Sequence, residues 1–580
     1  MRKTRPETLR FTSVTRQIPL SHVKSDSIRG GSAVPERCYV HGTMMNYPLL
    51  LTSFLERAGK QFPNVEIVSR RPDRTLVRTC YGAFHDRARR LAEALTRLGI
   101  KRGDRVATML WNQDAHLEAF FGVPATGAIL HTLNLRLHPH EIAAIAAKAQ
   151  DRFLIVDDIA VPLLDKFRDE SAFEKIIVVP YGCDAIPPGA LNYEELLASA
   201  TGKFEYPALD ENDGAAMCFT SGTTGNAKGV VYTHRSLVLH SMSEAMADSM
   251  ALSHHDTLLT IAPMFHANAW GVPFTAVMVG AKLVLPGPVL DSESILDLLV
   301  FEKVTIANAV PTIWIGVLDA MEKHPGRWKF ANPVRVICGG SAPPVSIMRR
   351  LDVLGIHMMH FWGMTETSPL ATTGRLKRNT VNAPADKQYA ARSKQGWPLP
   401  LIDIRVTHPD HADQILPWDG ETSGELEIRG PWVAGKYYEL PEADDRWTAD
   451  GWFRTGDVAT IDEDGIMKLV DRTKDLVKSG GEWISSVDLE NSLMAHPAVK
   501  EACVVGLPHP KWQERPIAAV VLKESAAATP EELSAFLAKT FAKWQLPDAI
   551  VFVDAIPRTS VGKFKKTELR ERFADWKWDS

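Results

Sequence analysis

Cysteine is scarce in this sequence, and no two cysteines are spaced as a pair. The 580 residues include six cysteines that lie far apart and form no Cys-x-x-Cys motif. This pattern excludes a disulfide framework and a zinc knuckle, and it fits a reducing compartment. We therefore expect each cysteine to be a small apolar core residue rather than a nucleophile. The six are Cys38, Cys80, Cys183, Cys218, Cys338 and Cys503.

Long apolar runs and an excess of positive charge are also lacking. The most apolar stretches, residues 283–290 and 306–318, contain proline and fall short of the roughly 18 residues of a membrane span. The 66 Lys and Arg residues face 70 Asp and Glu residues, so the net charge is −4. This balance creates no broad positive field for nucleic acid. We expect no transmembrane segment and no nucleic-acid partner, and any bound anion must be held by local groups.

What is present is ordinary globular composition at a length that exceeds one domain. Hydrophobic residues make up 45% and charged residues 23%, and the chain shows no internal repeat or low-complexity tract. This composition excludes collagen-like and disordered chains. A prior of about 150 residues per domain favours several packed units over a small binding module.

Residues 1–43 differ from the rest of the chain. They carry eight Lys or Arg residues against three acidic ones and show no sustained apolar periodicity. They fit either an organelle transit peptide or translation from an upstream start codon, because an amphipathic segment opens at Met44. We favour the second interpretation and a cytoplasmic location; the first would imply import into an organelle.

The next part of the chain alternates helical and strand patterns. This alternation predicts parallel sheets covered by helices, in two α/β layers. The expected helices are residues 84–98, 140–149 and 193–199, and the expected strands are residues 105–110, 153–156, 175–179, 282–285, 305–310 and 334–338.

Two smaller units follow. After residue 373 strands and turns dominate, and residues 424–430 alternate with period two, which predicts a small β unit. From residue 471 the pattern restarts with a helix near 486–494, strands at 502–506 and 517–522, and a helix from Pro530. We expect an α/β fold in which residues 44–472 form a large domain of two α/β layered subdomains plus a small β-barrel-like subdomain. Residues 473–580 would form a smaller α+β domain.

A glycine-rich segment at residues 219–230 gives the densest chemical signal. It follows an apolar strand, and its glycines and hydroxyls can surround phosphate oxygens while Lys228 adds a cation. It does not match the Walker A pattern, which disfavours kinase-like and GTPase-like chemistry. The alternative is a solvated glycine-rich hairpin. The residues that would bind phosphate are Ser221, Gly222, Thr223, Thr224, Gly225 and Lys228.

This segment is the first of eight ordered motifs that together resemble the adenylate-forming enzymes. That family includes acyl- and aryl-CoA synthetases, firefly-type luciferases and the adenylation domains of peptide synthetases. The resemblance covers about residues 45–575. The other motifs are residues 262–266 (APMFH), 339–343 (GGSAP), 362–367 (WGMTET), 452–457 (WFRTGD), 471–475 (DRTKD), 478–483 (KSGGEW) and 557–563 (PRTSVGK).

The resemblance implies attack of a carboxylate on the α-phosphorus of ATP with loss of pyrophosphate. Glu366 and Ser221 would hold Mg²⁺, and Thr365 would bond a phosphate oxygen. Asp457 would accept from the ribose hydroxyls beside Arg472. Without the resemblance, Asp457 and Arg472 would be read as a surface ion pair. The remaining implied nucleotide contacts are Gly340, Ser341, His360, Phe361, Trp362, Lys478 and Trp483.

The resemblance also implies a mobile C-terminal domain. Lys563 would bridge the carboxylate and the phosphate during adenylation. The domain would then turn about Lys474, and Gly480 and Gly481 would lie along the pantetheine of CoA. A plain hairpin turn explains the two glycines equally well. The basic residues Lys565, Lys566 and Arg570 are expected to be a solvated helix face without a role.

The acid-binding residues are the least determined. Residues 265–271 resemble the fatty-acyl-CoA synthetase subgroup, in which a Trp at the Trp270 position gates an apolar acyl tunnel; Trp270 as a plain core residue is the alternative. His266 and Gly339 would line the acyl pocket. The implied activity is an ATP-dependent fatty-acid–CoA ligase that uses ATP, Mg²⁺ and coenzyme A.

Several alternatives stay open. The enzyme could activate aryl or other carboxylic acids for another acceptor, such as a carrier protein. The chain could also be a catalytically inactive relative that binds acyl groups or nucleotides. Dimers occur in the subgroup, so a homodimer is open as well.

Overall fold

The structure is a computed structural model that describes residues 42–183, 186–220, 227–408, 411–479, 482–559 and 562–578. The chain divides into residues 1–47 and residues 48–580, and the fold below belongs to the second unit. Within the described ranges, no helix has both the length and the apolarity needed to span a bilayer.

The first layer is a mostly parallel sheet. Among the described residues it has seven strands in the order β7-β6-β5-β3-β4-β8-β9, and only β8 and β9 run antiparallel. The strands are β3 (Arg105–Met109), β4 (Ile129–Thr132), β5 (Asp151–Asp157), β6 (Lys175–Val179), β7 (Leu191–Asn192), β8 (Gly214–Phe219) and β9 (Gly229–Thr233). The helices of this region are α2 (Tyr81–Arg97), α3 (Asp114–Ala125), α4 (Pro139–Ala149), the short α5 (Val161–Leu164) and α6 (Tyr193–Ala198).

The second layer is a larger mixed sheet. Its order in the described chain is β16-β15-β14-β13-β12-β10-β11-β1-β2, with a parallel centre and antiparallel edges. The strands are β1 (Glu66–Arg70), β2 (Leu76–Cys80), β10 (Thr257–Thr260), β11 (Lys282–Leu285), β12 (Ile306–Ala309), β13 (Val334–Cys338), β14 (Ile356–Gly363), β15 (Leu370–Thr373) and β16 (Trp397–Pro398). The helices are α1 (Leu51–Gln61), α7 (His234–Ala245), α8 (Val272–Val279), α9 (Ser292–Phe301), α10 (Pro311–Lys323), α11 (Val345–Val353) and α12 (Ala385–Arg392).

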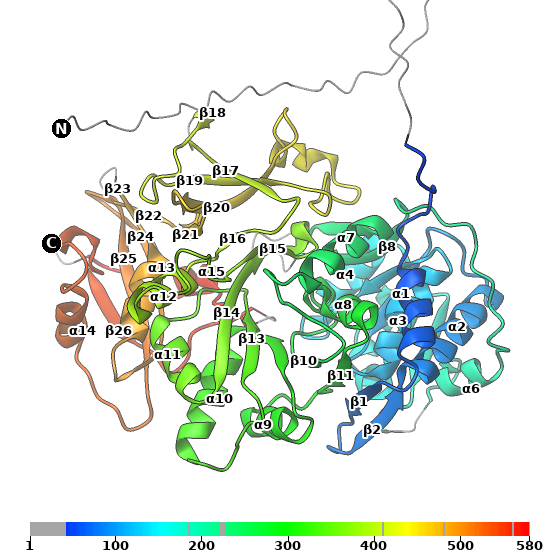
Figure 1. Cartoon of the computed structure of the whole chain (residues 1–580). Helices are drawn as coiled ribbons and strands as arrows, with labels where there is room; N and C mark the ends of the chain where they lie inside the picture. Colours follow the sequence, from blue (N-terminus) through cyan, green and yellow to red (C-terminus); the bar gives the residue numbers. More distant parts are fainter. Residues whose placement is uncertain are drawn as a thin grey trace, which may run out of the picture. The chain divides into compact units, whose positions relative to one another are not determined.

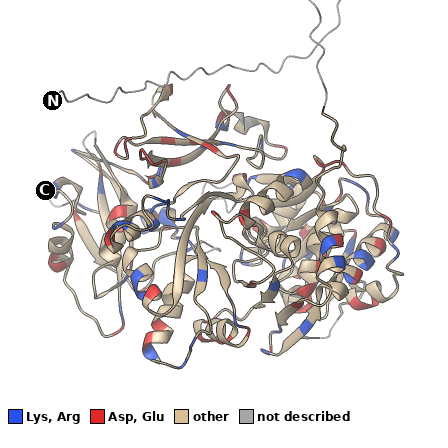
Figure 2. Cartoon of the chain, in the orientation of Figure 1, with Lys and Arg blue, Asp and Glu red and all other residues tan. Residues whose placement is uncertain are grey.

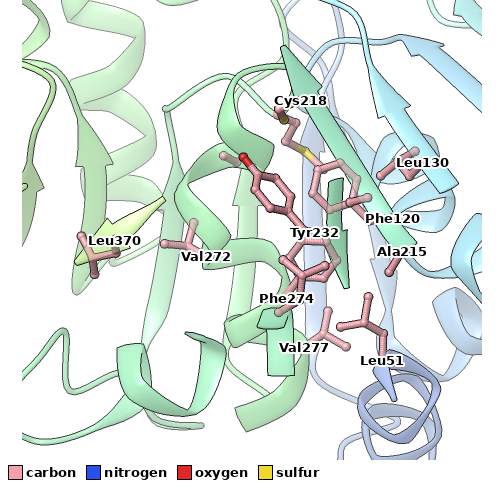
Figure 3. Close-up of a cluster of buried hydrophobic side chains, with 14 of the residues drawn as sticks. Leu51, Phe120, Leu130, Ala215, Cys218, Tyr232, Val272, Phe274, Val277 and Leu370 are labelled. Atoms are coloured by element: carbon pink, nitrogen blue, oxygen red, sulfur yellow. The ribbon is translucent and has the colours of Figure 1, made fainter. Parts of the chain in front are cut away.

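The two layers share one core, because residues of both sheets and of the helices between them pack into a single buried cluster. Eleven of the twelve residues of α3, residues 115–125, are buried in one continuous run, as expected for a helix enclosed by protein. Phe120 of α3 packs on Phe274 of α8 with ring centroids 5.1 Å apart. Figure 3 shows both rings beside Tyr232 and Cys218 of the first sheet. Rigid packing of this kind fixes the positions of the strand ends that carry the site.

The small β unit is an antiparallel sheet of five described strands in the order β18-β17-β19-β20-β21, with β18 and β21 at its edges. The strands are β17 (Asp403–His408), β18 (His411–Ile415), β19 (Gly424–Arg429), β20 (Phe453–Ile461) and β21 (Met467–Arg472). One polar residue of the period-two segment, Glu427, is fully buried. It is paired with Arg405 at 2.6 Å and with Arg454 at 3.5 Å, which offsets the cost of burying its charge.

The C-terminal unit has its own sheet and core. Among described residues its strands run β23-β22-β25-β24, and β26 pairs with β25. The elements are β22 (Val477–Ser479), β23 (Glu482–Ile484), α13 (Ser486–Met494), β24 (Val499–His509), β25 (Gln513–Leu522), α14 (Pro530–Leu537), β26 (Ala549–Phe552) and α15 (Lys566–Arg572). Figure 1 shows these elements in orange and red as a group of their own.

The α/β prediction is confirmed, and local signals explain several boundaries. Helix α14 starts at Pro530 because the Thr529 hydroxyl accepts from Glu532 N and the Glu532 carboxylate accepts from Thr529 N, a capping box. Figure 2 shows acidic and basic residues interspersed on the helices that cover the sheets. The cysteine prediction is right for buried Cys218, Cys338 and Cys503 but wrong for Cys183, which is exposed; Cys38 lies outside the described residues.

Candidate active site

A cavity of about 610 Å³ opens where the parallel strands of the second sheet end. Carboxyl ends of β12, β13 and β14 line it, as is usual for ligand sites in open α/β sheets. The small β unit contributes residues 455–456, and the C-terminal unit contributes residues 562–567. The cavity therefore brings together three units that are far apart in the sequence.

The turn after β13 requires glycine. Gly340 has φ +86°, and a Cβ there would lie 3.4 Å from Lys563 Cε. A Cβ on Gly339 would lie 3.1 Å from the carbonyl oxygen of Phe361. The two glycines thus allow a close approach to β14 and to Lys563. Ser341 and His360 are not among the described residues that line the cavity, and burial lowers the pKa of His360 to about 4.

Trp362 and Arg472 line one wall of the cavity, and Asp457, which is not among the described lining residues, contacts both of them. The Trp362 indole N–H donates to Asp457 Oδ2 at 3.1 Å, and Arg472 Nε lies 3.2 Å from Asp457 Oδ1. Asp457 and Arg472 face each other across the antiparallel pair β20–β21. The charge of Asp457 raises the pKa of Arg472, although burial opposes the rise. The carboxylate is therefore fixed in orientation, with further lone pairs that can accept from ribose hydroxyls.

Thr365 and Glu366 lie on the short 3-10 helix η4 (Thr365–Thr367). Tyr437 Oη donates to Glu366 Oε1 at 2.6 Å, and Lys228 Nζ lies 4.8 Å from the centre of the Tyr437 ring. Tyr232 Oη on β9 donates to the Thr365 carbonyl at 2.8 Å. The strand that follows the glycine-rich loop is thereby tied to the acid that would bind a metal.

Glu366 suits the predicted magnesium ion. Its side chain is buried, and Tyr437 occupies one carboxylate oxygen. The described residues contain no cluster of three or more metal-ligating side chains. Mg²⁺ is commonly held by one or two carboxylates together with substrate phosphates, so a single fixed carboxylate fits it. Ser221, the other predicted metal ligand, lies outside the described residues, as do Gly222, Thr223, Thr224 and Gly225.

Lys563 enters the cavity on a closed turn. Thr559 N donates to the Lys563 carbonyl at 2.7 Å, and Lys563 N donates to Thr559 Oγ1 at 3.1 Å. Arg558, beside this turn, pairs with Glu501 at 2.8 Å. Burial and the charge of Arg472 lower the pKa of Lys563 to about 8, although the charges of Asp457 and Glu366 act to raise it. The side chain therefore loses its proton at a lower pH than an ordinary lysine does.

The acyl side holds Trp270, Gly339 and His266. Trp270 Cη2 would lie 3.7 Å from a Cβ on Gly339, so the indole edge covers that glycine. Trp270 stands on the 3-10 segment η3 (Ala267–Gly271), where four non-glycine residues have positive φ. Burial lowers the pKa of His266 to about 3, so its ring is neutral. This wall presents apolar and uncharged groups.

Lys565 and Lys566, which were expected to have no role, also line the cavity, and so do Arg136 and Arg446. The last two were not predicted at all. The Arg136 guanidinium lies 5.7 Å from the Trp111 ring and 5.8 Å from the Phe265 ring. Arg446, at the end of the 3-10 segment η5 (Pro441–Arg446), donates from Nη2 to the Arg454 carbonyl at 2.6 Å. Like Tyr437, these residues stand outside any recognisable motif, so no local signal could have indicated them.

The predicted hinge lies between two sheets. Lys474 lines the cavity between the end of β21 and the start of β22, and its carbonyl accepts from Arg570 Nη2 at 3.2 Å. Lys478 and Trp483 are opposed in the β22–β23 pair and are not among the described lining residues. The structure does not bring these two to the cavity. Gly480 and Gly481 lie outside the described residues.

The amino-acid sequence of the chain matches two protein-family models. Residues 55–438 match the model of the AMP-binding enzyme, which is more than half of the chain, and residues 488–563 match the AMP-binding enzyme C-terminal domain. The chain belongs to the AMP-binding enzyme family. This membership confirms the predicted resemblance to adenylate-forming enzymes.

Relatives of this AMP-binding enzyme are acid–CoA ligases. A long-chain-fatty-acid–CoA ligase of Thermus thermophilus is 46% identical over 92% of this chain and 97% of its own. A 3-methylmercaptopropionyl-CoA ligase of Ruegeria lacuscaerulensis is 42% identical over 92% and 99%. A medium-chain-fatty-acid–CoA ligase of Ectopseudomonas oleovorans is 40% identical over 92% and 98%. ATP-bound MatB from Rhodopseudomonas palustris shares the fold, with TM-score 0.77 and 25% identity over 91% of this chain and 99% of its own.

Proposed function

We propose that the protein is an AMP-forming acid–CoA ligase for aliphatic carboxylic acids. The observation that carries the proposal is that Lys563, Glu366 and Arg472 line one cavity and that Arg472 is paired with Asp457, the acid expected to bind the ribose. A cation, a metal-binding acid and a ribose-binding acid are the groups that formation of an acyl adenylate requires. The relatives at 40–46% identity are named as CoA ligases, which supports the same reaction.

In the first half-reaction a carboxylate oxygen attacks the α-phosphorus of ATP, and the bond to pyrophosphate breaks. The Lys563 ammonium lies where it can neutralise the approaching carboxylate and the α-phosphate. Asp457, held by Trp362 and Arg472, orients the ribose. A Mg²⁺ ion held by Glu366 would neutralise phosphate charge.

In the second half-reaction the CoA thiolate attacks the acyl carbonyl carbon, and AMP leaves as the C–O bond breaks. Lys563 fills the space beside Gly340, so we propose that it withdraws before this step. The connection at residues 472–476, between the last strand of one sheet and the first of the next, is the proposed pivot. This assigns residues 44–472 to a binding domain and residues 473–580 to a mobile one.

The substrate class rests on the acyl wall and on the relatives' names. The relatives are named for long-chain, medium-chain and methylmercapto-substituted acids, all aliphatic. The Trp270 edge and the neutral His266 ring suit an apolar chain. We also propose a cytoplasmic location, since the described cysteines are all free.

A panel of acids tests the proposal. The protein is incubated with ATP, Mg²⁺, CoA and straight-chain, methylthio-substituted or aromatic acids, and the thioester, AMP and pyrophosphate are quantified by mass spectrometry. We expect thioester and AMP in equal amounts with aliphatic acids. Acyl-AMP that accumulates despite free CoA would instead indicate another acceptor, such as a carrier protein. Absence of pyrophosphate with every acid would reject adenylation.

A further inference from the structure

The helix that follows Lys563 is joined to the strand that precedes the pivot. Lys566, the first residue of α15, pairs through Nζ with Glu490 Oε1 at 2.8 Å and donates to Ser486 Oγ. Ser486 in turn donates to Asp471 Oδ2, through its backbone N at 2.8 Å and through its hydroxyl. The expectation that Lys566 and Arg570 form a solvated face is therefore wrong.

These four residues are shielded from water. Ser486 is 0% exposed, Asp471 5% and Glu490 7%. Burial lowers the pKa of Lys566, but the charges of Glu490 and Asp471 raise it well above its usual value. Glu490 also accepts from Val504 N at 2.8 Å. Buried charges are stable only when they are paired and hydrogen-bonded, so removing one member leaves the others uncompensated.

The network crosses the proposed pivot. Asp471 belongs to β21, whereas Ser486 and Lys566 belong to α13 and α15 of the C-terminal unit. Arg570, one turn after Lys566 on the same face of α15, pairs with Asp475 at 2.9 Å inside the connection itself. Arg570 thus binds the segment about which the domain would turn, whereas Lys566 binds Ser486 and Glu490 of α13.

We propose that Lys566 is a positioning residue for Lys563. By binding Ser486 and Glu490 it joins α15 to Asp471 and holds the C-terminal domain in the arrangement that places Lys563 in the cavity. Turning the domain about residues 472–476 separates Ser486 from Asp471, so the network favours the first half-reaction over the second. This inference rests on the proposed function and deepens it.

The test measures the two half-reactions separately. Lys566→Met keeps the length of the stem and removes the charge. We expect acid-dependent ATP–pyrophosphate exchange to fall by about tenfold or more, the usual size of such a coupling, while thioester formation from supplied acyl-AMP stays within about twofold. Exposed Lys577→Met is the control. Equal loss in both half-reactions, unchanged exchange, or loss confined to the second half-reaction would overturn the proposal.

Ser486→Ala is a smaller change than Lys566→Met and controls for misfolding. Ser486→Ala removes the bridging hydroxyl but leaves Lys566 paired with Glu490, and Asp471 still accepts from the backbone amide. We expect the same asymmetry at about fivefold. Ser492→Ala on the same helix is the matched control. A Ser486→Ala protein that exchanges at the wild-type rate would contradict a link through this hydroxyl.

Hydrogen exchange separates this inference from the proposed function. Amides of residues 485–495 should exchange faster in Lys566→Met and Ser486→Ala than in the wild type and Ser492→Ala. If the wild type released no pyrophosphate with any acid, the proposed function would fail, but this readout would still test the network. Equal exchange in all four proteins would overturn it.

Discussion

Two regions meet in the cavity, and they are held in different ways. The wall at β12, β13 and β14 consists of strands that are hydrogen-bonded on both sides within a large sheet. Lys563 instead stands on a single turn between β26 and α15, closed by two hydrogen bonds to Thr559. The wall can fix a nucleotide, whereas the turn supplies one cation that can leave without disturbing the wall.

The charges show the same division. Glu366 on η4 and Asp457 on β20 each accept a fixed hydrogen bond, from Tyr437 and from Trp362 respectively. Lys563 approaches them from the other unit. The first half-reaction needs the Lys563 ammonium, and the second needs the space that it fills. Movement of the segment that carries Lys563 can therefore serve both steps. The predictions below test whether the two regions really act in different half-reactions.

The largest effect is expected from Lys563→Ala. Loss of the cation should slow acid-dependent pyrophosphate exchange by about 10²–10³-fold, the size reported for removal of one preorganised donor to a developing charge. Thioester formation from supplied acyl-AMP should remain within a few-fold. Single-turnover assays of both steps check this. Equal loss of both steps would mean that Lys563 acts in both half-reactions rather than in the first alone.

Glu366→Gln tests the region that faces Lys563 across the cavity. The amide keeps the shape but loses the charge that a hard cation requires, so we expect exchange to fall by about a hundredfold. The apparent affinity for Mg²⁺ should fall with it, which a titration of exchange against Mg²⁺ concentration measures. Wild-type Mg²⁺ dependence in this variant would place the metal elsewhere.

The pKa of Lys563 predicts the pH dependence of the first step. Because its pKa is lowered to about 8, the ammonium loses its proton as the pH rises through that value. The kcat/KM of exchange for ATP should therefore decline by about tenfold per pH unit above the pKa. Lys563→Arg, which stays charged, should lower the rate but remove this alkaline decline. A decline that persists in the arginine variant would belong to another group.

The sequence predicted most of the elements because their signals are local. Apolar strands such as 175–179 and 334–338 coincide with β6 and β13, and the start of α14 follows from its capping box. The same holds for the site residues in motifs, since glycines and acids at fixed spacings carry their own signal. The roles of those residues stay predictions until the variants are measured.

The contacts that the sequence did not reveal are those created by tertiary packing. Tyr437 reaches Glu366 across 71 residues, and Lys566 reaches Ser486 across 80. The left-handed turn at Ala267–Trp270 is also invisible in the sequence, because only Gly271 there favours positive φ. Long-range pairing and strained backbone depend on the surrounding fold, so no local pattern could report them.

Tyr437→Phe tests one of these long-range contacts. Without the hydroxyl, Glu366 loses its donor but keeps its charge. We expect about a tenfold loss in exchange, as for a hydrogen bond to a charged group. The loss should appear mainly as weaker Mg²⁺ dependence. Tyr438→Phe, at the adjacent position, is the control, and an equal effect of both changes would argue for a general packing role.

Trp270→Ala should have the smallest effect, and it should concern the acid alone. The indole edge covers Gly339 on the acyl wall, so its removal opens space at the end of a bound chain. Each methylene buried there is worth about 0.8 kcal/mol, or roughly fourfold in kcat/KM. The preference between acids that differ by one carbon should therefore shift by up to about fourfold, while the KM for ATP stays constant. An unchanged preference among the acids would indicate that Trp270 is a plain core residue. A changed KM for ATP would indicate that Trp270 contacts the nucleotide instead.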